Sequence, residues 1–226
     1  MQQFDLAARD VRGLNAQLQR RDGNQQTHFE VSNPMGQHAI AAGCMHDIDV
    51  QIHGHVGYYC AGMNQSASVC VHGNAGVGVA ENMMSGLVRV TGDASQSAGA
   101  TAHGGLLVIE GNASARCGIS LKGADIVVGG SVGHNSAFMA QAGHLVVCGD
   151  AEDGLGDSIY EAVIYVGGTV AGLGADCVQK EMSEAHLAQL KALLEQSGLE
   201  HDPAGFKRYG SARTLYNFNV DNIGQY

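Results

Sequence analysis

Charged residues and prolines are scarce in this sequence. Only 15% of its residues are charged and two are prolines, while 33 of the 226 are glycines. Glycine does not recur at every third position, so a collagen triple helix is excluded, and a hydrophobic content of 45% argues against disorder. We therefore expect a globular chain, and such a weakly charged surface is typical of one that a partner covers.

Positive charge is scarcer than negative charge. Twelve Lys and Arg stand against 22 Asp and Glu, and no basic run exceeds the pair Arg20 and Arg21. Nucleic acids and anionic membranes attract clustered positive charge, so we expect neither as a partner. The sequence also lacks an apolar run of about 18 residues and a secretory leader at its N-terminus. We accordingly expect a cytoplasmic protein that does not span a membrane.

Motifs of catalysis and metal binding are missing as well. There is no nucleophile elbow, no P-loop and no HExxH, and the GxG strings lack the GxGxxG spacing of dinucleotide sites. His53 and His72 share a phase, which allows a metal site or, as we prefer, an outward ladder of histidines without a carboxylate at their level. We predict no catalytic residue, no cofactor-binding residue and no metal ligand in this chain. The six cysteines contain no CxxC pair, and we interpret them as buried thiols: Cys44, Cys60, Cys70, Cys117, Cys148 and Cys177.

A glycine recurs at a constant interval through the middle of the chain. It stands at Gly54, Gly73, Gly92, Gly111, Gly130, Gly149 and Gly168, a period of 19 without an insertion. Aliphatic residues occupy the positions four and two before each glycine, from Val50 and Ile52 to Ile164 and Val166. This period-two alternation predicts a strand with one inward face that ends in a turn at glycine. Seven positions after the glycine stands a small residue, Ala or Gly, which indicates a tight corner or a close backbone approach.

This repeat predicts an all-β fold. A single repeat unit buries too few side chains to offset its backbone entropy, whereas stacked units share strand hydrogen bonds and cover one another's apolar faces. We expect a single-stranded, right-handed parallel β-helix of seven coils over residues 48–180. Residues 1–47 would form an N-terminal cap with helical spacing in residues 5–20. Residues 181–226 would form a helix between Ser183 and Gly198 and then an irregular aromatic tail.

Two surfaces leave alternatives open. The outward strand positions are polar in the first three coils and apolar in the last four, ending in Val127, Val146 and Tyr165. Either the C-terminal helix lies over this stripe or a second protein binds there. Polar residues at the corners of successive coils, in the loops that follow the recurring glycines, would form a partner surface, internal polar ladders or a catalytic cluster. They are Arg116, His134, Asn135, Asp157, Tyr160 and Glu161.

The corners carry a resemblance to known proteins. GDASQSAGA (92–100) and GDAEDGLGDSIYEA (149–162) resemble the GXGXG domain of the glutamate synthase large subunit, and the repeat is also similar to the β-helical subunit of formylmethanofuran dehydrogenase. As a free-standing chain with NPMGQHAIAAG (33–43), GYYCAGMN (57–64), AENMMSG (80–86) and RCGISLKG (116–123), it most resembles the small β-helix subunit of N-methylglutamate synthase.

That resemblance implies a heteromeric complex. Its other members would be an amidotransferase-like subunit and a glutamate-synthase-like subunit that carries FMN and iron–sulfur clusters. The complex would act as a transferase, a methylamine–glutamate N-methyltransferase that joins methylamine to glutamate with release of ammonia, and this chain would be its non-catalytic structural subunit. The alternatives are a β-helix subunit of a glutamate synthase or formylmethanofuran dehydrogenase assembly, or a β-helix that binds a ligand or catalyses a reaction alone.

Overall fold

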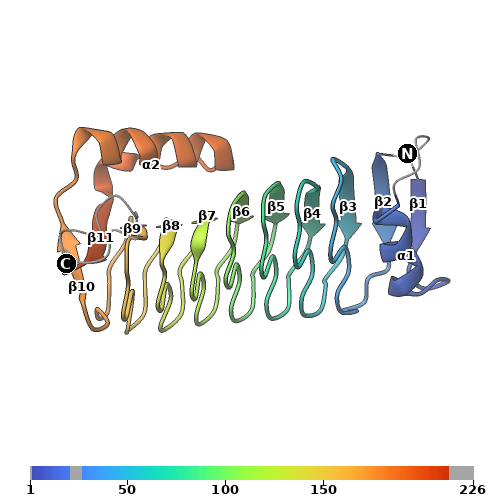
Figure 1. The fold of residues 1–226 in the computed structure, drawn as a ribbon, viewed down its shortest axis with the longest axis horizontal. Coiled ribbons are helices and arrows are strands. Elements are labelled where there is room, and N and C mark those ends of the chain that lie inside the picture. The colour runs from blue at the N-terminus through green and yellow to red at the C-terminus, as the bar shows by residue number, and fades with distance from the viewer. Residues whose placement is uncertain (1, 21–26, 214–226) are drawn as a thin grey trace, which may run out of the picture.

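The chain forms one long rod of stacked coils (Figure 1). The computed structural model describes residues 2–20 and 27–213. Within them, one sheet has the strand order β1-β2-β3-β4-β5-β6-β7-β8-β9-β11-β10. The strands are β1 (Gln2–Asp5), β2 (His28–Ser32), β3 (Asp49–His53), β4 (Ser68–His72), β5 (Leu87–Val90), β6 (Leu106–Ile109), β7 (Lys122–Val128), β8 (Ala142–Val147), β9 (Val163–Val166), β10 (Cys177–Lys180) and β11 (Lys207–Ser211). The expected parallel β-solenoid is confirmed.

The strands pair in the register that the repeat predicts. Val50 on β3 faces Val69 on β4, which faces Val88 on β5, and the same parallel pairing continues to Ile164 on β9. One irregularity lies in β7, between Lys122 and Asp125. The parallel ladder also extends upstream of residue 48, because β2 pairs in parallel with β3 and β1 in parallel with β2.

The interior is built from rows of equivalent residues. Both inward strand rows are buried in all seven coils, with no side chain more than 1% exposed. The row of small residues adopts the left-handed conformation at Ala61, Ala80, Gly99, Gly118, Ala137 and Gly156. At Gly99, an added Cβ would lie 2.5 Å from Cδ1 of Ile126, so this corner admits no larger residue. Of the two alternatives for this position, the tight corner is confirmed, and the atoms nearest to Gly99 are side-chain atoms of Ile126 and Leu107 rather than backbone.

A ladder of side-chain hydrogen bonds between coils runs past the recurring glycine. The residue after each of the first six glycines carries an acceptor that binds the backbone N–H of its equivalent one coil further on. Asp93 Oδ1 accepts from Asn112 N at 2.7 Å, and Asn112 Oδ1 accepts from Ser131 N at 2.9 Å. The acceptor passes directly over the next glycine: a Cβ on Gly111 would lie 2.4 Å from Asp93 Oδ1. Glycine is therefore required at this position by close approach, because Gly54 alone of the seven has a positive φ.

The structure has two α-helices among its described residues, one near each end of the rod. Helix α1 (Val11–Leu18) buries Leu14 and Leu18, and its Asn15 side chain bonds the backbone of Ala39 and Ala41. Helix α2 (Glu184–Ser197) begins after the N-cap Ser183 and ends at Gly198, whose φ is 69°. Both boundaries of the C-terminal helix are as predicted. Among the described residues, neither helix is long and apolar enough to cross a membrane.

Helix α2 lies over the outward apolar stripe, and Figure 1 shows it running along the sheet above β7 to β9. Leu190, Leu193, Leu194 and Phe206 pack there against a buried set made of Val127, Val146 and Tyr165. The C-terminal end of the helix is held by Arg89 on β5, whose Nη2 donates to Ser197 O at 2.6 Å. Of the two alternatives for this stripe, the covering helix is correct, and a second protein on it is excluded.

The segment after α2 is more regular than expected. A short 3-10 helix spans Pro203–Gly205, and β11 then inserts antiparallel between β9 and β10. The expectation of an irregular segment was wrong here, because the last parallel strand leaves an open edge whose backbone groups β11 satisfies. The rest of the predicted aromatic tail, residues 214–226, lies outside the described residues.

Candidate functional site

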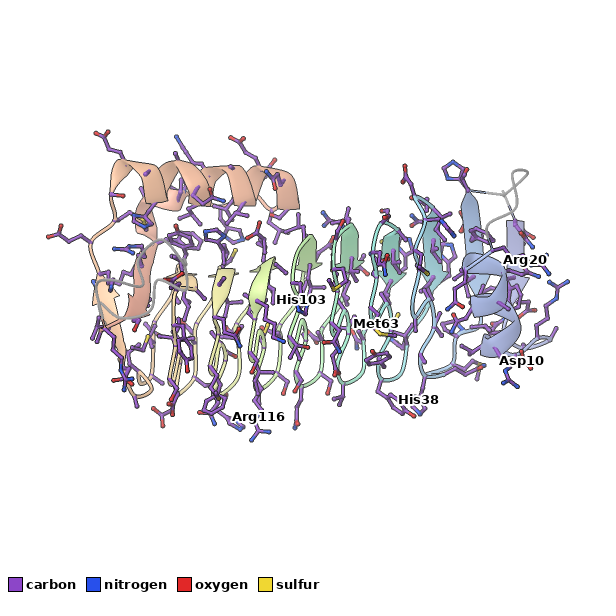
Figure 2. The ribbon with its side chains drawn as sticks, viewed as in Figure 1. Asp10, Arg20, His38, Met63, His103 and Arg116 are labelled. Carbon is purple, nitrogen blue, oxygen red and sulfur yellow. The ribbon has the colours of Figure 1, made fainter. Side chains whose placement is uncertain are left out.

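Six exposed apolar side chains gather on the turn segments of the first coils. They are between 40% and 81% exposed, and we call them the apolar flank: Met35, Met45, Tyr58, Met63, Val77 and Met84. Figure 2 shows His38 at the lower edge of these N-terminal coils and Met63 at mid-height on them, with Arg116 at the lower edge further along the rod. The sequence signal was the group of apolar residues in GYYCAGMN and AENMMSG, two of the strings that carry the resemblance.

Coil-to-coil hydrogen bonds bring the members of the flank together. Tyr59 N donates to Val77 O at 2.8 Å, which sets Tyr58 and Val77 in the same row of adjacent coils. Met84 N donates to Asn64 O at 2.7 Å, so Met84 lies beside the segment that carries Met63. Tyr58 is also stacked on His38, with ring centroids 3.8 Å apart. These hydrogen bonds thus hold two pairs of flank residues, Tyr58 with Val77 and Met63 with Met84, beside each other on adjacent coils.

Charge is distributed unevenly around the flank. Residues 27–88 contain no Lys or Arg, while Glu30, Asp47, Asp49 and Glu81 supply four negative charges. Further along the rod, the turn segments carry the charged residues Arg116 and Asp153, and Lys122 begins β7. The repeat therefore tolerates charge at these turns, and the exposed apolar residues are densest on the first coils, with Met139 and Leu173, each 39% exposed, on later ones.

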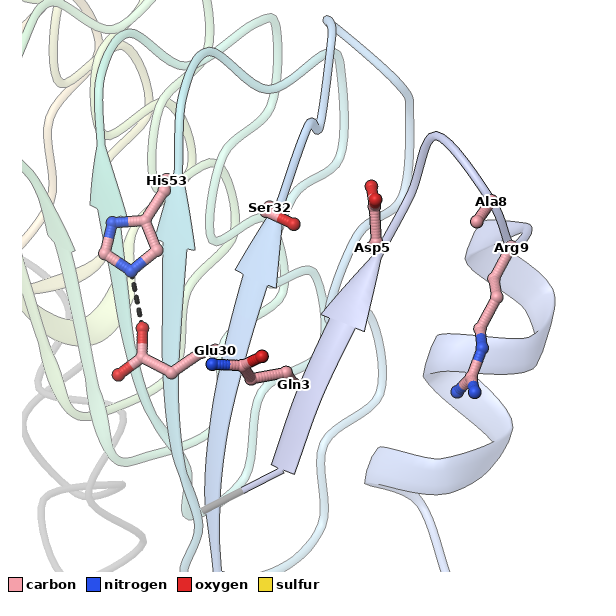
Figure 3. Close-up of a pocket in the computed structure, with 7 residues that line it drawn as sticks. All are labelled: Gln3, Asp5, Ala8, Arg9, Glu30, Ser32 and His53. Atoms are coloured by element: carbon pink, nitrogen blue, oxygen red, sulfur yellow. Dashed lines mark hydrogen bonds and ion pairs between the residues drawn. The ribbon is translucent and has the colours of Figure 1, made fainter.

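A polar groove opens over the outer face of β1 to β3 (Figure 3). It has a volume of about 650 Å³ and is lined by Gln3, Asp5, Ala8, Arg9, Glu30, Ser32 and His53. Glu30 Oε2 lies 2.5 Å from His53 Nε2, and His53 stacks on His72 with ring centroids 4.9 Å apart. The hydrogen bond that Asn33 donates to Asp5 lowers the pKa of that carboxyl group.

These contacts test our interpretation of the histidines. The predicted stacking of His53 on His72 is confirmed, but the expectation that no carboxylate lies at their level was wrong. Glu30 contacts His53 because β2, which we had assigned to the cap, already continues the sheet. Across residues 2–20 and 27–213, no group of three or more His, Cys, Asp or Glu is placed to hold a metal ion.

The polar corner residues do not converge on one point. Arg116 N bonds His134 O, Asn135 N bonds Asp153 O, and the imidazole Nδ1 of His134 lies 3.8 Å from Glu152 Oε2. Asp157 accepts, through its backbone, from Met139 one coil away. Tyr160 lines a separate hollow of about 200 Å³ near Arg213, and Glu161 is exposed. Most of these contacts join backbone groups of neighbouring coils, and the role of these side chains as a partner surface, internal polar ladders or a catalytic cluster stays a prediction.

A second polar cluster lies near the start of α2. His144 Nδ1 is 2.7 Å from Asp125 Oδ1, and His186 Nδ1 is 2.5 Å from Ser183 Oγ. Burial, Arg208 and His144 together lower the pKa of His186. Beneath the helix, the buried hydroxyl of Tyr165 has no hydrogen-bond partner among the described atoms. Asp125 and His144 stand one repeat apart in the sequence, a spacing that would have revealed their contact.

The cysteines carry no disulfide. All six are free, and Cys44, Cys60, Cys117 and Cys177 are buried, as predicted, while Cys70 and Cys148 are only half-buried. Burial raises the pKa of the Cys60 and Cys117 thiols to about 12. A thiol with so high a pKa is a poor nucleophile near neutral pH, so the interior cysteines serve packing.

Comparison with known proteins places this solenoid in a family. No family model matches the chain. The chain is 58% identical over 225 residues to Protein GlxC of Rhizobium meliloti (strain 1021), and the alignment covers 99% of both chains. Identity of this extent over the whole length shows that the chain belongs to the same family as Protein GlxC.

Proposed function

We propose that this chain is a structural, non-catalytic subunit of a glutamate-synthase-like, FMN-dependent complex. The complex would be N-methylglutamate synthase, which joins methylamine to glutamate with release of ammonia. An amidotransferase-like subunit and a subunit with FMN and iron–sulfur clusters would carry out the chemistry. The GXGXG-like corners and the 58% identity to Protein GlxC support a glutamate-synthase-related role.

The observation that carries a structural role is the use of the polar side chains that directly follow the recurring glycines. Asp150 Oδ1 accepts from both the backbone N–H and the hydroxyl of Thr169, and the same ladder continues through Ser131 and Asn112. A side chain engaged in holding the next coil is not available to a substrate. The rod is therefore suited to hold other subunits at a fixed separation, because parallel coils with continuous ladders deform little.

The test is a reconstitution of the complex from separately purified subunits. Formation of N-methylglutamate from methylamine and glutamate is measured with and without this chain, and the chain is also assayed alone. We expect the complete mixture to be active, the mixture without the chain to lose its assembly and its activity, and the chain alone to be inactive. Turnover by the chain alone would refute the proposal and support a catalytic β-helix.

A matched pair of variants separates a structural role from a chemical one. Arg116→Lys and His134→Gln change these polar side chains while leaving intact the backbone hydrogen bond that Arg116 N donates to His134 O; the second change also removes the imidazole that lies 3.8 Å from Glu152 Oε2. We expect kcat of the reconstituted complex to stay within about twofold of wild type, because residues outside the reacting centre contribute little to kcat. A loss of kcat with assembly unchanged would assign these residues to an active site.

A further inference from the structure

We propose that the apolar flank is the docking surface for a partner protein whose contact area is apolar and rimmed by lysine and arginine. The location and chemistry of the surface follow from this chain alone. Only the statement that the partner is another subunit of the complex rests on the proposed function.

The composition of the flank is that of an interface core. Methionine and tyrosine are enriched in the buried centres of protein interfaces, whereas Lys and Glu are depleted there. Single exposed apolar side chains are ordinary, but here four methionines, a tyrosine and a valine lie on adjacent coils. Methionine also adapts its shape to a partner, and the rigid coils beneath it lower the entropy lost on binding.

The fold itself does not require these residues. The row of Met63 continues with the polar residues Asn82, Thr101 and Ser120 at equivalent points of the coil ladder, and it returns to an apolar residue at Met139. The row of Val77 continues with Gln96 and that of Met84 with His103 and Lys122. Because the same coils stack equally well on polar residues, the apolar side chains on the first three coils need another explanation, and a covering partner supplies one.

The negative charge around the apolar flank favours one kind of partner protein. The chain has a formal net charge of −10, and residues 27–88 carry four acidic residues and no Lys or Arg. Two copies that met through this flank would bring these negative charges together, which disfavours a homodimer. A partner with a basic rim would instead pair with Asp47 and Glu81 beside the flank. We therefore commit to a basic-rimmed partner rather than to a second copy.

The repeat supplies variants that should leave the fold intact. Met63→Ser, Val77→Gln and Met84→His each introduce a residue that its own row already holds on a later coil. The control variant combines Ser120→Asn, His134→Gln and Gln141→His, which make the same kind of exchange on the same rows near the middle of the rod. Circular dichroism and thermal unfolding should show both triple variants to be folded like the wild type.

Binding to the purified partner subunits then decides the question. We expect Kd to rise about 100-fold or more for the flank variant and to stay within about twofold for the control, because a few central residues carry most interface energy. Added salt should weaken the wild-type complex, since a charged rim contributes to it. Hydrogen exchange should slow on complex formation in residues 57–66 and 76–85. Unchanged binding by the flank variant, or protection confined to other segments, would overturn the proposal.

The outcomes for this surface and for the proposed function are separable. A partner that is lost with the flank variant but carries no flavin would keep this inference and refute the function. A flavin-bearing complex that still forms with the flank variant would support the proposed function and refute this inference. A wild-type dimer of the isolated chain that the flank variant converts to a monomer would identify a second copy as the occupant and overturn the inference.

Discussion

Replacing Gly111 by alanine tests the proposed reason for the recurring glycine. The added Cβ would lie 2.4 Å from Asp93 Oδ1 and 2.8 Å from Gly92 O, closer than non-bonded atoms approach. Either the Asp93 side chain leaves Asn112 N, which loses a hydrogen bond of about 1 kcal/mol, or the coils separate, which costs about 1–3 kcal/mol of overpacking strain. We expect both effects to occur in part and together to lower the free energy of unfolding by about 2–4 kcal/mol.

Urea unfolding followed by circular dichroism measures this loss. The control is Gly205→Ala, because an added Cβ at Gly205 has no atom within 4 Å and should change stability by about 0.5 kcal/mol at most. A third variant, Asp93→Ala, removes the clashing oxygen, so adding Gly111→Ala to it should cost less than in the wild type. If Gly111→Ala is as stable as Gly205→Ala, close approach is not the reason for the glycine.

Four further predictions concern the core, the covering helix and titration. Tyr165→Phe should leave thermal stability unchanged or raise it by about 1 kcal/mol, because it removes a buried hydroxyl that has no partner among the described atoms; a clear loss would reveal a hidden one. Leu190→Ala should cost about 2–5 kcal/mol in urea unfolding, whereas Gln189→Ala on the exposed side of α2 should cost little; equal effects would contradict the covered stripe. The pKa of about 12 predicts that Cys60 resists iodoacetamide at pH 8 in the folded chain and reacts in urea, as mass spectrometry of the peptides would show. Hydrogen bonds from Thr169 hold the pKa of Asp150 below 3.8, so the ionised carboxylate stabilises the fold above that value and this stabilisation is lost as pH falls through the folded pKa. In acid unfolding, the difference in stability between wild type and Asp150→Asn should therefore shrink at low pH. A difference that does not change with pH would contradict the role of Asp150 in the ladder.

The fold was predictable because its signal is periodic. A fixed repeat length places Val50, Val69 and Val88 in one row whatever the details of the corner, and the pairing follows from that. Helix α2 was predictable from local chemistry, since the Ser183 hydroxyl caps the first backbone N–H groups and Gly198 adopts the left-handed conformation that ends a helix. Periodicity and capping are local properties, which a single sequence displays.

Features that depend on distant contacts were not predictable in the same way. Residues 207–211 have no alternation, and they form β11 only because β9 presents an open edge. The acceptor after each glycine was present in the sequence but differs in type, as Asn74, Asp93 and Ser131 illustrate, so that only the geometry reveals one common role. The apolar flank likewise emerges from exposure, which residue type alone does not give.

The central claim is that this chain is a structural subunit of a flavin-bearing complex. The most direct test is the native mass and absorption spectrum of the material that purifies with the tagged chain from its own cells. We predict a mass well above 23.4 kDa, a spectrum of flavin and iron–sulfur clusters, and a colourless chain once the subunits are separated. A colourless species with the mass of the chain alone would contradict the account.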